Sequence, residues 1–443
     1  MINAMKVKSA RQLAYTVLLR VEKEKAYSNL ALDSELKNSN LEKRDKAFAA
    51  ALVYGVIERR ITIDYNLSLY LSKPLKKLKT ETLTALRLGA FQILFSSSVP
   101  DSAAVNESVK LSKSNGFSYS SGLINAILRK VAKNGFIFPD SGDKINFLSV
   151  KYSCPGHLIE KWLSEYGEKN TLSILKHSLG NSKITVRVNT LRTTAADLKD
   201  SLEKDGVKCE YGFAENSLVL SLSGTAVDET VQFKKGLFHV QGIPSQLCAI
   251  ALDAKAGETV YDLCSAPGGK AFTIAEIMNN NGKVFAFDLY EGRVHLIEKG
   301  AKRLGIDIIT AAVGNASVFE PKLGQADRVL CDVPCSGLGI ISKKPEIKYK
   351  DKSEFAALPD IQYSILENGS KYVKHSGRLV YSTCTLNKSE NEGVCERFLR
   401  NHKDFVSVNP FGITENEHFV TFFPDEHNND GFFVAAFERK DHA

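Results

Sequence analysis

The sequence lacks the features of a secreted or membrane-spanning protein. No apolar run reaches the roughly 18 uncharged residues that a transmembrane helix requires. No apolar segment follows the basic stretch 1–11, so we expect no signal peptide. The eight cysteines include no CxxC pair and no cysteine–histidine cluster with zinc-ligand spacing, so no metal site is predicted. Without a secretion signal they are expected to be reduced thiols. We therefore expect a cytoplasmic protein that binds neither membrane nor metal.

The positive charge of the sequence is unevenly distributed. The net charge is +7, with 23 lysines and arginines against 13 acidic residues in 1–145, and 35 against 38 in the rest. A basic N-terminal third is typical of a protein that contacts a polyanion through that part. A helical surface with additional solvated lysines is the alternative interpretation. With 443 residues, 43% of them hydrophobic, the chain can bury the cores of two or three domains.

Residues 1–143 are predicted to form an all-α domain. Apolar residues recur there at helical spacing, and the predicted helix 121–133 is one example. In it Leu123, Ile127 and Val131 would face the core, while its lysines and arginine would face the solvent. The positive excess of the chain therefore lies on a helical domain.

The rest of the chain is predicted to contain two further parts. Residues 144–232 form a small α+β segment, with strands near 183–190 and 217–222 and a helix at 195–204. A ferredoxin-like arrangement is one possibility for this segment. In 233–443 strands and helices alternate, which is typical of a doubly wound α/β sheet.

Three short motifs each follow an apolar run that is predicted to be a strand. The motifs are Asp262-Leu263-Cys264-Ser265-Ala266-Pro267-Gly268-Gly269-Lys270, Asp332-Val333-Pro334-Cys335-Ser336-Gly337 and Tyr381-Ser382-Thr383-Cys384-Thr385, after predicted strands at 259–261, 328–330 and 378–380. The carboxyl ends of strands in an open α/β sheet meet in one crevice. We therefore expect a glycine-rich loop, an acid with a thiol and a second thiol to share one site.

The glycine-rich loop has the features of a nucleotide-cofactor site. Its glycines let the backbone approach a ligand, and a helix N-terminus follows. It does not match the GxxxxGK[ST] phosphate loop, so an NTPase is not predicted. Asp288 ends the next predicted strand and could accept both ribose hydroxyls of an adenosine. The spacing fits NAD and S-adenosylmethionine equally, but the later motifs offer thiols and no hydride-transfer site. An ordinary strand-to-helix turn is the alternative.

Two thiols and an acid in one site suit methyl transfer to a pyrimidine ring. Cytosine C5 is a poor nucleophile, but addition of a thiolate at C6 makes the ring an enamine that can attack a methyl group. An acid such as Asp332 near N3 would stabilise the charge that develops. The second thiol is a candidate to assist the final elimination. The alternative is that Cys335 and Cys384 are merely small buried residues.

The three motifs resemble those of RNA cytosine-5 methyltransferases with a Rossmann-like catalytic domain. The whole chain resembles the bacterial 16S ribosomal RNA cytosine-5 methyltransferases of the RsmB (Sun or Fmu) family. Members join a NusB-like helical RNA-binding domain to the catalytic core. Here 10–133 is similar to NusB-like sequences and Arg187-Val188-Asn189 to the family's RVN element. The resemblance implies a NusB-like domain at 1–143, an α+β segment at 144–232 and a Rossmann-like methyltransferase domain at 233–443.

The resemblance also implies roles for matching residues. Cys384 is the nucleophile, Cys335 assists product release, and Asp332 lies between the cofactor and the base. The residues implied to bind S-adenosylmethionine are Cys264, Ser265, Ala266, Pro267, Gly268, Gly269 and Lys270 at its methionine end, Asp288 at its ribose, and Arg293, Asn315 and Asp332. Asn315 stands where the family usually has an acid facing the adenine, and it can still donate and accept hydrogen bonds. Attack by Cys335, as in DNA cytosine methyltransferases, is the alternative.

The function implied is methylation of C5 of a specific cytosine in 16S ribosomal RNA through a covalent bond between Cys384 and C6. The substrate would be naked RNA or a pre-30S particle, and the enzyme is expected to be a monomer. One alternative is the same chemistry on tRNA. Another is an RNA-binding or antitermination factor with a vestigial catalytic domain, which the presence of Asp332, Cys335 and Cys384 opposes.

Overall fold

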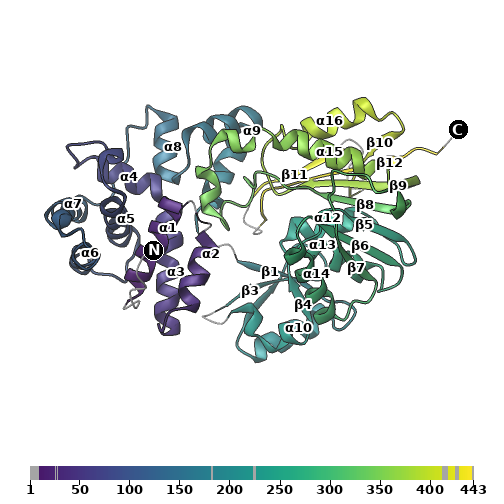
Figure 1. Cartoon of the computed structure of the whole chain (residues 1–443), viewed down its shortest axis with the longest axis horizontal. Helices are drawn as coiled ribbons and strands as arrows, with labels where there is room; N and C mark the ends of the chain where they lie inside the picture. Colours follow the sequence, from purple (N-terminus) through teal and green to yellow (C-terminus); the bar gives the residue numbers. More distant parts are fainter. Residues whose placement is uncertain are drawn as a thin grey trace. The chain divides into compact units, whose positions relative to one another are not determined.

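The structure of the chain is a computed structural model that describes residues 9–24, 26, 28–180, 183–222, 226–411, 418–424 and 429–441. The chain divides into two compact units, Met1–Thr171 and Leu172–Ala443 (Figure 1). Within the described residues, strands occur only in the second unit. The division that we predicted at 143/144 and 232/233 remains a prediction.

The first unit is helical, as predicted. Its helices are α1 Ala10–Glu24, α2 Ser28–Lys37, α3 Lys43–Glu58, α4 Arg60–Ser68, α5 Thr80–Phe95, α6 Asp101–Ser114, α7 Ser121–Asn134, α8 Lys144–Tyr152 and α9 Gly156–His177, the last of which continues into the second unit. The backbone of α9 breaks at Gly167, which has φ 73°. Helix α7 confirms the predicted helix, but its core face is rotated. Leu123, which we predicted to face the core, is 39% exposed, whereas Ile124, Ile127, Leu128 and Val131 are buried.

The second unit begins with a small antiparallel sheet. Its elements are β1 Ile184–Val188, α10 Ala195–Lys204, β2 Lys208–Tyr211, β3 Ser217–Ser221, α11 Val231–Lys234 and β4 Phe238–Val240, with strand order β2-β3-β1-β4. Leu198 and Leu202 of α10 pack against Val186 and Leu218 of the sheet. The helix begins after Thr194, whose side chain accepts a hydrogen bond from the backbone N–H of Asp197.

The remainder of this unit is built on a mostly parallel sheet. Its elements are α12 Ile243–Ala251, β5 Thr259–Asp262, α13 Gly269–Ile277, β6 Lys283–Asp288, α14 Glu291–Leu304, β7 Ile309–Val313, β8 Ala326–Asp332, α15 Leu358–Ser370, β9 Val373–Thr383, α16 Glu392–Asn401, β10 Phe405–Val408, β11 Phe419–Phe422 and β12 Phe432–Arg439. The strand order is β10-β12-β9-β8-β5-β6-β7, and β11 pairs with β12. Strands β5 to β9 pair in parallel, whereas β12 is antiparallel to β9, β10 and β11.

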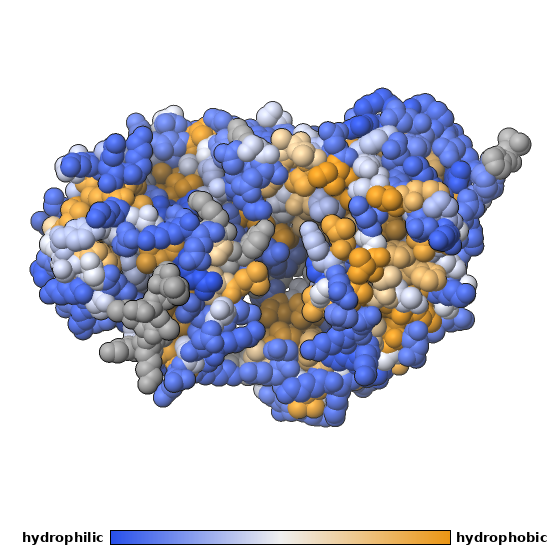
Figure 2. All heavy atoms as spheres, viewed as in Figure 1, coloured by the Kyte–Doolittle hydropathy of each residue, from blue (hydrophilic) through white to orange (hydrophobic). Residues whose placement is uncertain are grey.

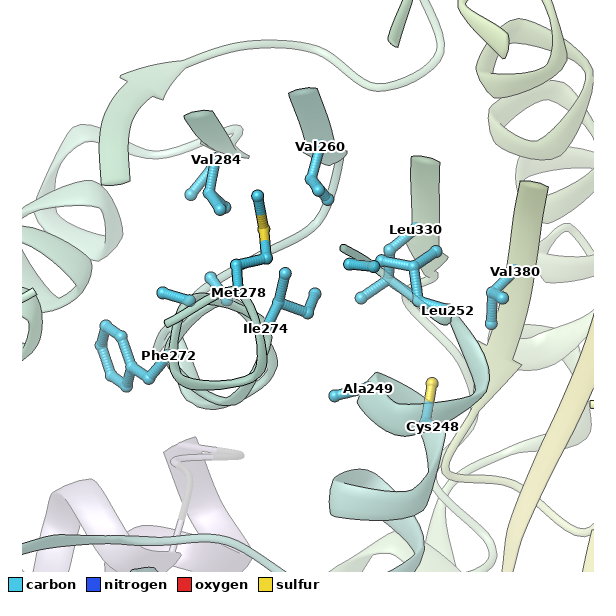
Figure 3. Packing of buried hydrophobic residues seen from close by; sticks show 14 of the residues in the cluster. Cys248, Ala249, Leu252, Val260, Phe272, Ile274, Met278, Val284, Leu330 and Val380 are labelled. Carbon is cyan, nitrogen blue, oxygen red and sulfur yellow. The ribbon is translucent and has the colours of Figure 1, made fainter. Parts of the chain in front are cut away.

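Helices cover both faces of this sheet, so the predicted doubly wound architecture is confirmed (Figure 1). Alternate strand residues point to opposite faces. On one face Val260 and Leu330 pack with Cys248 of α12 and Ile274 of α13 (Figure 3). On the other face, Tyr261 belongs to the cluster that includes residues of α15 and α16. A short strand that is buried on both faces needs a continuous apolar run, which is the pattern that precedes each motif.

Hydrophilic residues cover most of the visible surface (Figure 2). In the described ranges, no helix combines the length and apolar composition needed to cross a membrane.

Candidate active site

The glycine-rich loop lies where the strand order reverses. Strand β5 has β6 on one side and β8 on the other, and the loop leads from its carboxyl end to α13. The N–H of Ser265 donates to the carbonyl of Phe287 in β6 at 2.7 Å. Gly268 has φ 106°, and a Cβ there would lie 2.4 Å from Cζ of Phe272. The conformation and the close packing therefore both require glycine at 268.

Two buried side chains at this loop are incompletely hydrogen-bonded. The carboxylate of Asp262 and Oγ of Ser265 make no hydrogen bond of normal geometry among the described residues, although the Ser265 hydroxyl and the N–H of Cys264 lie close enough to lower the pKa of Asp262. Burial raises the pKa of Asp262 to about 7. Unpaired buried polar atoms cost free energy, so these atoms suit a ligand that brings donors. We did not assign a role to Asp262 from the sequence, although its place at the end of β5 was visible there.

Asp288, Arg293 and Asn315 surround the end of β6. Asp288 ends that strand and is 4% exposed. The guanidinium of Arg293 lies 3.2 Å from Oδ2 of Asp288 and donates to the carbonyl of Ala266 at 3.0 Å. Arg293 therefore ties the glycine-rich loop to Asp288. Asn315 is exposed beyond β7, and its Oδ1 accepts from the N–H of Ser317 at 3.0 Å.

Lys270, Asp332 and Ser382 connect α13 to the ends of β8 and β9. Nζ of Lys270 lies 2.7 Å from Oδ2 of Asp332, and Oγ of Ser382 donates to Oδ1 at 2.7 Å. Burial acts to lower the pKa of Lys270, but the negative charge of Asp332 outweighs it and raises this pKa above its usual value. Lys270 is therefore a protonated donor that holds one oxygen of Asp332.

The two motif cysteines are in direct contact. Their Sγ atoms lie 3.2 Å apart, although one thiol follows β8 and the other β9. Among the eight free cysteines, only Cys264, Cys335 and Cys384 are partly exposed, and the other five are buried. The hydrogen bond with Cys384, together with burial, raises the pKa of Cys335 well above its usual value. Burial also raises the pKa of Cys264 well above its usual value. Cys335 and Cys264 therefore keep their protons at neutral pH.

The structure thus brings together the acid, the two thiols and the last residue of the glycine-rich loop, as the motifs predicted. Sequence reasoning missed the partners of Asp332 and the buried contacts behind the thiols. Ser382 was visible in its motif, but nothing in the local pattern indicated that it bonds Asp332.

Comparison with known proteins covers almost the whole chain. Residues 8–133 match the NusB family, 154–227 match the Methyltr_RsmF/B-like, ferredoxin-like domain, and 249–438 match the family described as 16S rRNA methyltransferase RsmB/F. These matches confirm the predicted succession of a NusB-like helical part, an α+β middle part and a methyltransferase core, and they identify the middle part as ferredoxin-like.

Relatives align with the chain over nearly the full length of both proteins. The chain is 36% identical to the probable ribosomal RNA small subunit methyltransferase B of Bacillus subtilis, over 98% of this chain and 100% of that protein. It is 33% identical to the protein of the same description from Synechocystis sp., over 97% and 99%. The solved structure of PH0851 is 27% identical, covers 97% of this chain and 99% of its own, and has a TM-score of 0.81. The chain therefore belongs to the RsmB family of 16S ribosomal RNA methyltransferases.

Proposed function

We propose that this protein uses S-adenosylmethionine to methylate C5 of a specific cytosine in 16S ribosomal RNA, through a covalent bond between Cys384 and C6. The observation that carries the assignment of residues is the 3.2 Å contact between Cys335 and Cys384, in the same site as the Lys270–Asp332 pair. The relative from Bacillus subtilis is named as a probable ribosomal RNA small subunit methyltransferase B.

The loop from Cys264 to Lys270, with Asp288, Arg293 and Asn315, holds the cofactor. S-adenosylmethionine supplies an electrophilic methyl group when it is bound. The buried carboxylate of Asp262, which lacks a hydrogen bond of normal geometry among the described residues, fits its cationic amino group. Asp288 accepts hydrogen bonds from the ribose hydroxyls, and Arg293 holds the Asp288 carboxylate in place.

Cys384 is the nucleophile, as its Thr383-Cys384-Thr385 motif indicates by resemblance to the family, and Sγ of Cys335 lies 3.2 Å from its sulfur. At that distance the S–H of Cys335 can donate a hydrogen bond to Sγ of Cys384. The thiolate of Cys384 would add to C6, and C5 would take the methyl group, which leaves S-adenosylhomocysteine. The C5 proton would then pass to solvent, and the bond between sulfur and C6 would break. The S–H of Cys335 would then stabilise the departing sulfur, so the same hydrogen bond would assist both the addition to C6 and the final elimination.

Asp332 orients the base. Lys270 and Ser382 each hold one of its carboxylate oxygens, so its rotamer is restricted. A carboxylate fixed in this way can accept a hydrogen bond from the N4 amino group of the cytosine and so hold the ring where the thiolate adds. The protonated Lys270 balances the charge of Asp332 in a site that excludes much of the solvent.

The function is tested by bisulfite sequencing of total RNA from cells with and without the gene. We expect one cytosine of 16S ribosomal RNA to lose its protection when the gene is deleted, and to regain it when purified protein and S-adenosylmethionine are added to RNA or pre-30S particles from those cells. Loss of protection in tRNA alone would contradict the proposed substrate. Unchanged protection everywhere would contradict the activity.

Replacing Asp288 with alanine is expected to weaken cofactor binding. Hydrogen bonds to a charged group contribute more than neutral ones, so losing those to the ribose should raise the Kd for S-adenosylmethionine about 10- to 100-fold. Arg293 is 52% exposed and can be solvated when its partner is lost. Isothermal titration calorimetry measures the change. The control is Glu291→Ala, which removes a nearby exposed carboxylate; equal weakening in both variants would contradict the role of Asp288.

We also expect RNA to contact the lysine loop of the first unit, which we define as Lys73, Lys76, Lys77 and Lys79. All four are exposed, and none forms an ion pair with another described residue. Nζ of Lys79 lies 4.8 Å from the ring centroid of Tyr119, which is 64% exposed. Lysines neutralise phosphates, and an exposed aromatic ring can stack with a base.

Changing Lys73, Lys76 and Lys77 together to glutamine should therefore weaken RNA binding and its salt dependence. Each lost phosphate contact lowers the slope of log K against log salt by about 0.7 to 0.9, so three lost contacts would lower it by about 2 to 3. Fluorescence anisotropy with a 16S fragment at several salt concentrations measures both. In the control variant Lys299, Lys302 and Lys322 are changed together to glutamine, which removes the same charge from exposed positions of the second unit. Equal effects in both variants would show a response to net charge alone.

A further inference from the structure

A fully buried carboxylate lies behind the two thiols. Glu390 is 0% exposed and accepts four hydrogen bonds. Its Oε2 accepts from the N–H of Ser336 and from Nε2 of Gln362, both at 2.9 Å. Its Oε1 accepts from Oγ of Ser336 and from Nδ2 of Asn387, the latter at 2.7 Å. Three residues supply these four donor groups, so all four hydrogen bonds depend on the two acceptor oxygens of Glu390.

These bonds reach the residue that follows each thiol. Ser336 follows Cys335, and Thr385 follows Cys384. The Oγ atoms of Ser336 and Thr385 lie 2.6 Å apart. Because the hydroxyl hydrogen of Ser336 is directed to Glu390, the hydroxyl of Thr385 donates to Ser336. A continuous chain of hydrogen bonds therefore runs from Thr385 through Ser336 to Glu390.

The residue before Cys335 is held by the same group of side chains. Nε2 of Gln362 donates to the carbonyl of Pro334 at 3.0 Å as well as to Glu390. Cys335 thus lies between Pro334, which Gln362 links to Glu390, and Ser336, which bonds Glu390 directly. A separate bond from the N–H of Gly339 to the carbonyl of Cys384, at 3.0 Å, also joins the two loops. The loops can therefore stay in place in a folded protein even when Glu390 is changed, although less tightly.

We infer that Glu390 is a positioning residue that keeps Sγ of Cys335 in contact with Sγ of Cys384. It makes no contact with the reacting atoms and acts through Ser336 and Thr385. The thiols come from loops after different strands, and no covalent constraint sets their separation. Buried hydrogen bonds to a carboxylate are strong and geometrically restrictive, and a displacement of 1 Å in a reacting group can cost about 100-fold in rate. The consequence for catalysis rests on the proposed function, whereas the position of the thiols does not.

Oxidation of the two thiols by diamide measures their contact without RNA or cofactor. Cys335 and Cys384 lose two protons and two electrons to form one disulfide, and the N=N bond of diamide takes them up to become a hydrazine. Intact mass and peptide mapping follow formation of this disulfide. Its rate is compared with the rates at which iodoacetamide alkylates Cys335 and Cys384, because the charge of Glu390 also raises the pKa of Cys335 and its removal changes thiol reactivity.

Glu390→Gln should slow formation of the disulfide about tenfold. Glutamine has nearly the same size, but it offers one acceptor oxygen, and its NH₂ group faces two of the four donors. The control is Glu276→Gln, which alters another buried glutamate of the second unit, 1% exposed and paired with the buried Arg187. This control should leave the disulfide rate unchanged. A rate in folded Glu390→Gln equal to that of the wild type would overturn the inference.

Thr385→Val keeps the inference testable if Glu390→Gln does not fold. It removes the hydroxyl that donates to Ser336 and accepts from the N–H of Leu338 at 3.3 Å, but it leaves all four donors of Glu390 in place. We expect slower disulfide formation in this variant too, with circular dichroism and thermal unfolding close to those of the wild type. A folded Thr385→Val protein that forms the disulfide at the wild-type rate would also overturn the inference.

Turnover supplies a second readout. In Glu390→Gln we expect kcat to fall about 10- to 100-fold with the KM for S-adenosylmethionine unchanged. A protein–RNA adduct that survives denaturing electrophoresis should accumulate, because Cys335 no longer reaches the departing sulfur. If the wild type methylates no RNA, the proposed function fails while the disulfide rates still decide the position of the thiols. Wild-type kcat without adduct in the folded variant would contradict the role of Glu390.

Discussion

Cys384→Ser should abolish RNA methylation while leaving cofactor binding nearly unchanged. The thiol adds to the base and is not expected to contact the cofactor, so the Kd for S-adenosylmethionine should stay within about twofold of the wild type. A serine hydroxyl at its ordinary pKa cannot replace a thiolate as nucleophile. Removal of an enzyme nucleophile lowers kcat by a factor on the order of 10⁴ or more. Transfer of a tritiated methyl group from the cofactor to 16S ribosomal RNA measures the loss.

The matched control is Cys209→Ser, which changes a buried cysteine in the small antiparallel sheet. It can lower stability, but a folded Cys209→Ser protein should retain turnover. If Cys384→Ser methylates RNA at an appreciable fraction of the wild-type rate, the assignment of the nucleophile is wrong.

Cys335→Ala should trap the enzyme on its RNA. With Cys384 intact, addition to C6 and methyl transfer can both occur. The hydrogen bond between the two thiols raises the pKa of Cys335. A proton on Cys335 would stabilise the departing sulfur of Cys384, so losing this hydrogen bond should slow the final elimination. We expect a protein–RNA adduct that survives denaturing electrophoresis, carries a methylated cytosine, and forms only when S-adenosylmethionine is present.

The double variant Cys335→Ala/Cys384→Ser identifies the sulfur in that adduct. It should form none, because no thiol remains to add to C6. An adduct with Cys384→Ser and none with Cys335→Ala would reverse the two roles and make Cys335 the nucleophile. That outcome would also remove the reason for proposing that Glu390 acts on product release, although the disulfide experiment on the thiol contact would stand.

Much of the catalytic sheet was predictable from local patterns. The predicted strands at 259–261, 328–330 and 378–380 lie within β5, β8 and β9. Strands buried on both faces must be apolar throughout, so they are visible as short continuous runs. Helix α10 has the predicted bounds, because Thr194 caps it and its apolar residues follow the helical period.

Orientation was less predictable than position. The spacing of Leu123, Ile127 and Val131 fits a helix, yet the buried face begins one residue later, at Ile124. Adjacent residues differ by about 100° around a helix, so a helix with several apolar residues can bury alternative faces. Packing against neighbouring helices decides which face is buried, and the local sequence does not show which helices those neighbours are.

The sequence by itself determined the family, the three motifs and the strands that carry them. It could do so because hydrophobic periodicity and motif spacing are local properties. Only the tertiary structure decided that the thiols touch, that Lys270 and Ser382 share Asp332, and that Glu390 links the loops of Cys335 and Cys384. These contacts join residues that are far apart in the chain, and their distances are set by the pairing of β8 with β9 and by the packing around them.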